Sequence, residues 1–256
     1  ARQYEAALQL VAAADPGAPA ALQGIAAGGE DGYTALAQLQ AAGLKAKAGD
    51  VAGAVAIYEK MTADSALDDS FRNLALLLLA LHTADTAPPD QLIQRLQPLT
   101  AATNPWRFSA LELTAALARR AGDTAKAEQI LIVWEERARA LDRAWALALL
   151  ARCRALVLAA RGDLESAFAE FDRSLAEHAR SVDPFHYART LLALGATQRR
   201  AKRRGAARAT LEDARDIFER LGAALWAEKT RAELARIGGR TASRGELTAS
   251  ERRIAT

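Results

Sequence analysis

The sequence offers little that could support catalysis. Its 256 residues contain one cysteine, Cys153, which excludes an intramolecular disulfide and a CxxC metal site. Leucines on either side of Cys153 favour a buried, inert thiol over a nucleophile. No Walker-type phosphate-binding loop is present, and the three histidines have no serine or cysteine partner in a recognisable catalytic motif. We therefore predict that the chain is not an enzyme and has no cofactor.

Other features are scarce as well. Aromatic residues make up only 5% of the chain, and alternating stretches typical of strands are missing. No apolar run approaches the ~18 residues that a membrane helix needs, and the first residues lack the pattern of a signal peptide. Alanine dominates the apolar share, which favours closely packed helices over sheets. We expect an all-α, soluble chain located in the cytoplasm.

Four potential metal ligands lie close together in the sequence: Glu177, His178, Asp183 and His186. Their spacing matches no zinc pattern. Asp183 also precedes a proline, and this pair is typical of the start of a helix. We therefore predict no metal site.

What the sequence does contain is a repeat. A Gly-Asp pair recurs with a small residue five positions after the glycine and a large residue nine positions after it. The three copies are Gly49, Asp50, Ala54 and Tyr58; Gly122, Asp123, Ala127 and Leu131; and Gly162, Asp163, Ala167 and Phe171. A fourth copy has Lys202 in place of the glycine, with Ala207 and Leu211 at the same offsets. A turn near Thr83 would divide the long interval between the first two copies.

This pattern has a physical explanation. Glycine readily adopts the left-handed conformation that ends a helix, and aspartate caps the next helix. The small residue lets two helices cross closely, and the large one fills the groove between neighbours. Pro88-Pro89, Asn104-Pro105 and Asp183-Pro184 indicate further helix starts. We predict an α-solenoid of about five helical hairpins with a C-terminal capping helix near residues 222–237.

The repeat resembles the tetratricopeptide (TPR) family, whose unit is ~34 residues in two antiparallel helices. Within this family, residues 1–131 resemble the TPR segment of YfgM-like bacterial proteins, which are anchored in the inner membrane and face the periplasm. The similar stretches are ARQYEAALQL at 1–10, AGDVAGAVAIYEKM at 48–61, TAPPDQLIQRLQPL at 86–99 and NPWRFSALEL at 104–113. If this segment comes from such a parent, the chain would face the periplasm.

Residues 133–255 resemble the TPR region of large LuxR-type transcriptional activators. The similar stretches are WEERARALDRAWALALLARCR at 134–154, PFHYARTLLALG at 184–195, IFERLGAALWAE at 217–228 and ELARIGGR at 233–240. The segment GELTASERRIA at 245–255 is similar to the lead-in to that family's DNA-binding domain. We expect residues 132–239 to form this TPR segment with its capping helix, and residues 240–256 to form a flexible tail.

The charge balance also changes between the two segments. Residues 1–130 have a net charge of −4, and residues 131–256 have a net charge of +7. The two resemblances meet near residues 129–133, which suggests a fused or engineered chimera. Splicing two repeat segments is physically reasonable because each repeat contacts only its neighbours.

The densest charge feature is a basic cluster formed by Arg199, Arg200, Lys202, Arg203, Arg204 and Arg208. It could attract phosphates or an acidic partner, or it could be a solvated turn between two helices. No aromatic residue is interleaved to stack on bases, so nucleic acid is not the expected partner of this chain alone. The four tryptophans could line a groove, but packing between repeats is the more common role.

These observations predict a non-catalytic helical-repeat scaffold that binds a protein or peptide on its concave face. Two alternatives stay open. The chain could be a ligand-sensing TPR fragment of a transcriptional regulator without its ATPase and DNA-binding domains. It could also be an engineered chimeric scaffold that has no biological ligand.

Overall fold

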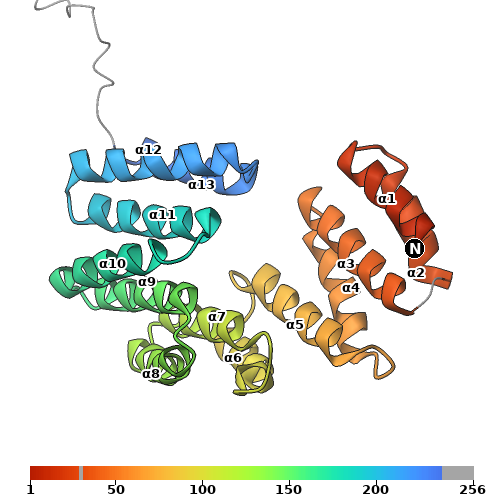
Figure 1. Ribbon diagram of the computed structural model, residues 1–256, viewed down its shortest axis with the longest axis horizontal. Coiled ribbons are helices and arrows are strands. Elements are labelled where there is room, and N and C mark those ends of the chain that lie inside the picture. Colours follow the sequence, from red (N-terminus) through yellow and green to blue (C-terminus); the bar gives the residue numbers. More distant parts are fainter. Residues whose placement is uncertain (29–30, 238–256) are drawn as a thin grey trace, which may run out of the picture.

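A computed structural model describes residues 1–28 and 31–237 (Figure 1). This part of the chain is all-α and has no strand. Its helices are α1 (Arg2–Ala12), α2 (Ala18–Gly28), α3 (Asp31–Lys47), α4 (Val51–Ala63), α5 (Asp69–Thr83), α6 (Pro89–Leu96), the short 3-10 helix η1 (Gln97–Thr100), α7 (Arg107–Arg120), α8 (Thr124–Ala140), α9 (Ala144–Ala160), α10 (Leu164–His178), α11 (Pro184–Arg200), α12 (Arg204–Arg220) and α13 (Ala224–Ala235). The helices pair with their neighbours in sequence and follow a curved path (Figure 1), which confirms the prediction of a helical solenoid.

Each repeated Gly-Asp pair forms the turn between two antiparallel helices. Gly49, Gly122 and Gly162 have φ values of 88°, 80° and 86°, in the left-handed region that glycine adopts without steric cost. The following aspartates accept hydrogen bonds from backbone N–H groups in the first turns of α4, α8 and α10. These caps satisfy donors that the helix itself leaves free. At the fourth turn, Lys202 adopts the same conformation, with a φ of 61°.

The small and large repeat positions lie in the core. The four small residues have no exposed surface: Ala54, Ala127, Ala167 and Ala207. The four large residues are at most 2% exposed: Tyr58, Leu131, Phe171 and Leu211. Each small residue therefore sits where its helix crosses a neighbour closely, and each large one fills the space beside it.

Buried side chains of α7, α8 and α9, between Phe108 and Val157, form one hydrophobic cluster. It includes Phe108 on α7, Trp134 on α8 and Leu150 on α9. Helix α8 runs unbroken from Thr124 to Ala140, and therefore passes through residue 131, where the two sequence resemblances meet. The packing is thus continuous across this point.

The structure differs from the sequence prediction in two places. The N-terminus forms an additional helix pair, α1 and α2, whose connection has Ala14 at a φ of 53° instead of a Gly-Asp turn. Helix α7 begins at Arg107 instead of Pro105, because Asn104 accepts a hydrogen bond from the Trp106 N–H within a preceding turn.

Helix α13 packs on α12, in the position expected of the capping helix. The predicted tail at 240–256 lies outside the described residues. Among the helices of the described chain, none is long and apolar enough to cross a bilayer.

Candidate binding groove

The first helices of four successive units surround one cavity. Helices α7, α9, α11 and α13 line a space of about 470 Å³, which we call the groove. The second helices α8, α10 and α12 contribute no residue to its lining. One face of the solenoid is therefore hollowed, and this face belongs to the first helices alone.

The lining follows the register of the repeat. Glu112 and Arg152 lie ten positions before Gly122 and Gly162, and Leu192 lies ten before Lys202. A second set lies six positions before the same turns: Ala116, Leu156 and Ala196. Residues four positions apart share one face of a helix. Each first helix thus presents the same face to the groove.

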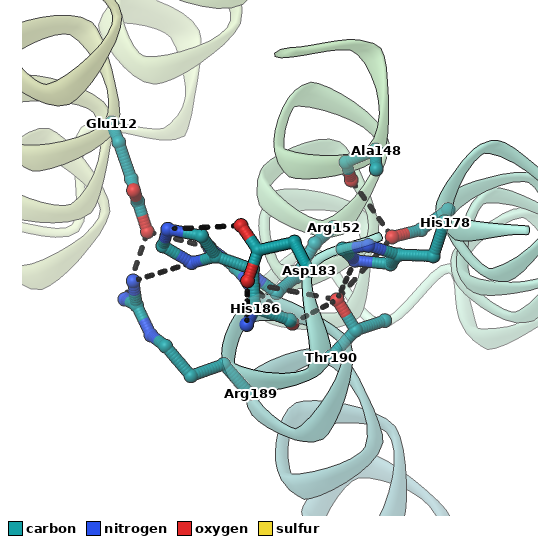
Figure 2. Close-up of polar contacts among 9 residues, drawn as sticks. Glu112, Ala148, Arg152, His178, Asp183, His186, Arg189 and Thr190 are labelled. Carbon is teal, nitrogen blue, oxygen red and sulfur yellow. Dashed lines mark hydrogen bonds and ion pairs between the residues drawn. The ribbon is translucent and has the colours of Figure 1, made fainter. Parts of the chain in front are cut away.

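An ion-pair network joins three of these helices at one end of the groove (Figure 2). Glu112 on α7 accepts hydrogen bonds at Oε1 from Arg152 Nη2 on α9, at 2.7 Å, and from Arg189 Nη2 on α11, at 2.8 Å. The Arg152 side chain is only 3% exposed, and that of Glu112 is 18% exposed. A charge as buried as Arg152 requires a partner, and Glu112 provides it.

Burial and charge act in opposite directions on these groups. Burial alone would raise the pKa of Glu112, but the charges of Arg152 and Arg189 outweigh it and hold the pKa below its ordinary value. Glu112 is therefore ionised at neutral pH. Burial lowers the pKa of Arg189, although the charge of Glu112 opposes this effect.

A second set of polar contacts lies beside the ion-pair network (Figure 2). Arg152 Nη1 donates a hydrogen bond to the backbone oxygen of His186 at 3.3 Å, and Thr190 Oγ1 lies 3.0 Å from His178 Nε2. The Ser174 hydroxyl donates to the backbone oxygen of Ala148 at 2.7 Å. Burial, followed by the charge of Arg152, lowers the pKa of His178 to about 4, so this imidazole is neutral at pH 7.

Comparisons with known proteins agree with this architecture. Residues 142–220 match a family model described as tetratricopeptide repeat. The matched segment comprises all of α9 to α12, and thus two of the four first helices that form the groove. None of the curated proteins compared with the chain matches it.

Solved structures show a similar fold. The chain is 18% identical to BtubC (BKLC) from P. vanneervenii, with a TM-score of 0.54, over 96% of this chain and 93% of that one. It is 20% identical to the nearly identical TPR-like repeats of a predicted kinesin light chain from Podosopora anserina, with a TM-score of 0.47, over 72% of this chain and 94% of that one. The first of these similarities covers nearly the whole chain.

The four potential metal ligands do not converge on one point, although His186 Nε2 lies 3.9 Å from Asp183 Oδ2. Glu177 forms an ion pair with Arg180 at 2.9 Å, and the side chain of Asp183 accepts a hydrogen bond from the backbone N–H of His186 at 3.0 Å. His178 contacts Thr190 instead of an acidic residue. Within residues 1–28 and 31–237, no group of three or more histidine, cysteine, aspartate or glutamate residues could hold a metal ion.

The basic cluster of the sequence is divided among several surroundings. Arg199 forms an ion pair with Glu233 of α13 at 2.9 Å, and Arg200 donates to the Thr197 hydroxyl at 3.1 Å. Arg203 stacks over Phe168 of α10, at 4.1 Å from the ring centre. Lys202 occupies the turn, Arg204 is exposed on α12, and Arg208 is half-buried there. Arg199, Arg200 and Arg203 thus contact other groups of the fold, whereas Lys202 and Arg204 are exposed.

The tryptophans and the cysteine take different roles. Trp134 is fully buried in the core, whereas Trp226 lines the groove. Trp145 is 38% exposed. Cys153 also lines the groove, but it is 8% exposed, which confirms the prediction of a buried thiol, and burial raises its pKa to about 12.

Glu112, Arg152 and Arg189 are not among the functional candidates predicted from the sequence. A signal was available for two of them, since Glu112 and Arg152 hold equivalent places in successive repeats and carry opposite charges. Arg189 has no such equivalence to either residue. Only the stacking of α11 on α9 brings it to the same carboxylate.

Proposed function

We propose that the chain is a non-catalytic helical-repeat scaffold that binds a protein or peptide segment in the groove between α7, α9, α11 and α13. The observation that supports this most strongly is the shape of that face. Four successive first helices enclose a cavity of about 470 Å³ that is lined by both apolar and charged side chains. Binding sites are commonly concave, mostly apolar and furnished with a few fixed polar groups.

The ion-pair network supports the same proposal. Arg152 and Arg189 are held by Glu112 from a third helix, so the polar end of the groove is rigid before any ligand arrives. A preorganised site loses less conformational freedom on binding. Tetratricopeptide repeats are in general scaffolds for protein contacts, and this chain has their fold.

A second candidate function is ligand sensing, as a TPR fragment of a transcriptional regulator. The size of the cavity favours it, because about 470 Å³ falls within the range of small-molecule sites. The two resemblances, of residues 1–131 to YfgM-like proteins and of residues 133–255 to LuxR-type activators, remain our proposal for the origin of the chain. The family match at 142–220 falls wholly within the second segment.

The binding proposal is tested by blocking the groove. Ala116 is exposed on α7 and lines the cavity, so Ala116→Trp would fill part of it without disturbing the core. We would select binders from a displayed peptide library against the wild-type chain and measure the affinity of the selected peptides for the variant. We expect at least a ten-fold loss of affinity.

The matched control is Ala169→Trp, at an exposed position on the second helix α10, outside the groove lining. It should leave peptide affinity unchanged. If the selected peptides bind the Ala116→Trp variant as tightly as the wild type, the groove is not the binding site and the proposal is wrong.

A further inference from the structure

Cations outnumber acids in the groove lining. Five cationic side chains face two carboxylates: Arg119, Arg152, Arg189, Lys229 and Arg236 against Glu112 and Glu233. Three positive charges are therefore left without a counterpart in the lining. A concave, partly apolar wall concentrates such a field and attracts anions.

The two carboxylates are each already shared between two arginines. Glu112 binds Arg152 and Arg189, and Glu233 binds Arg199 and Arg236. Each carboxylate is therefore already neutralised by two arginines and attracts a third cation only weakly. The groove holds its own acids in place and keeps a positive surplus.

Two of the lining cations have no ion pair within residues 1–28 and 31–237. These are Arg119, near the end of α7, and Lys229, on α13. Lys229 instead lies over the indole of Trp226, with Nζ 5.0 Å from the ring centre. Arg119 also acts on Arg200, whose pKa is lowered first by burial and then by this neighbouring charge. An anion placed here would relieve repulsion between cations as well as gain attraction.

Apolar surface lies next to these cations. Leu156 on α9, Leu192 on α11 and Trp226 on α13 contribute to the same cavity. The guanidinium group of Arg189 also lies over the Trp226 ring, with its central carbon 4.9 Å from the ring centre. The groove thus combines an apolar wall with cations that lack acidic partners.

We propose that this groove binds a carboxylate attached to an apolar body of the size of a small metabolite, with Arg119 and Lys229 supplying the countercharge and Leu156, Leu192 and Trp226 contacting the body. The inference rests on the proposed function in one respect, that the groove is the binding site, and it develops the second candidate function, ligand sensing, by assigning a ligand chemistry to this groove. A small organic acid and an acidic, apolar peptide side chain share this chemistry. We commit to the small organic acid, because the cavity volume suits a compact ligand.

The test follows the indole N–H signal of Trp226 in proton–nitrogen correlation spectra. The chain has four tryptophans, so the other three indole signals act as internal controls, and Trp226→Phe assigns the signal. The probe is 4-phenylbutyrate, compared with its neutral amide. We expect saturable shifts of the Trp226 signal with the acid, and at least ten-fold weaker binding of the amide.

Two variants locate the countercharge. Arg119→Gln and Lys229→Gln should each weaken 4-phenylbutyrate binding several-fold, and added salt should weaken binding to the wild type. The matched control is Arg120→Gln, because this neighbouring arginine donates to the backbone oxygen of Ala87 and does not line the groove. It should leave the affinity unchanged.

A capped peptide with one internal Glu-Phe pair tests the other source of the same chemistry. If this peptide shifts the Trp226 signal and 4-phenylbutyrate does not, the carboxylate comes from a partner protein and the small-molecule proposal is wrong. Equal binding of acid and amide, or no effect of Arg119→Gln and Lys229→Gln, would overturn the inference as well. These results leave the peptide-library test with Ala116→Trp unaffected, so the two proposals can fail separately.

Discussion

Arg152 Nη2 lies 2.7 Å from Glu112 Oε1, and the two residues occupy the same place in successive repeats, ten positions before the turn glycine. This ion pair adds to the apolar contacts of the hydrophobic cluster through which α9 packs against α7. Its strength depends on both members, because the Arg152 side chain is almost fully enclosed. The pair therefore connects repeat packing with the charge of the groove.

Replacing Glu112 with glutamine should destabilise the fold. Glu112→Gln keeps the size of the side chain but leaves Arg152 buried without a counter-ion, which costs about 3 kcal/mol. Urea unfolding followed by circular dichroism measures the change. Glu59→Gln is the control. The Glu59 side chain is 48% exposed and that of its partner Arg95 is 38% exposed, so this ion pair should contribute less than about 1 kcal/mol. Equal losses in the two variants would contradict this assignment.

Stability should fall as the pH drops from about 6.5 to about 4. His178 takes up a proton near its ordinary pKa of 6.5 in the unfolded chain, but only near a pKa of about 4 in the folded chain. The unfolded state therefore binds more protons in this window, which removes up to about 3 kcal/mol of stability. Urea unfolding at about pH 7 and about pH 4.5 measures the loss.

His178→Gln should reduce this loss because the amide does not titrate. Part of the loss should remain, since burial also lowers the pKa of His186. His82→Gln removes a histidine that stacks on Tyr58, away from the network, and should keep the full pH dependence. An unchanged loss in His178→Gln would show that another group carries it.

Gly195 permits a close approach between α11 and α12. A Cβ added there would lie 2.6 Å from Leu211 Cγ, and Leu211 is fully buried and has little room to move. We expect Gly195→Ala to destabilise the fold by about 1–2 kcal/mol, because overpacking exceeds the gain in helix propensity. The control is Gly205→Ala on α12, where nothing lies within 4 Å, and which should be neutral or stabilising by up to about 1 kcal/mol. A more stable Gly195→Ala variant in thermal unfolding would contradict the close approach.

The fold could be predicted from the sequence because its main signals are local. A glycine that ends one helix and an aspartate that caps the next depend on a few neighbouring residues, as at Gly122 and Asp123. The turn at Lys202 could still be located without glycine, since Ala207 and Leu211 kept their offsets. The α1–α2 pair was missed because its connection at Ala14 lacks this signature.

The groove could not be predicted in the same way. Arg189 reaches Glu112 across 77 positions in the sequence, and that contact depends on how three helices stack. The basic cluster attracted attention instead because its charges are adjacent in sequence. In the structure Arg199 and Arg203 belong to different surroundings, one facing α13 and the other facing α10.

The packing around α5 affects how the chain unfolds. Helix α5 contacts α6 and α7 more sparsely than α3 contacts α4 or α9 contacts α10. Because a solenoid holds together only through nearest-neighbour contacts, a sparse junction lowers the cooperativity with which the two sides melt. Denaturation of this chain would then proceed in two stages. The helices before α5 and the helices from α7 onward, which form the groove, would lose contact at α5 before either group unfolds.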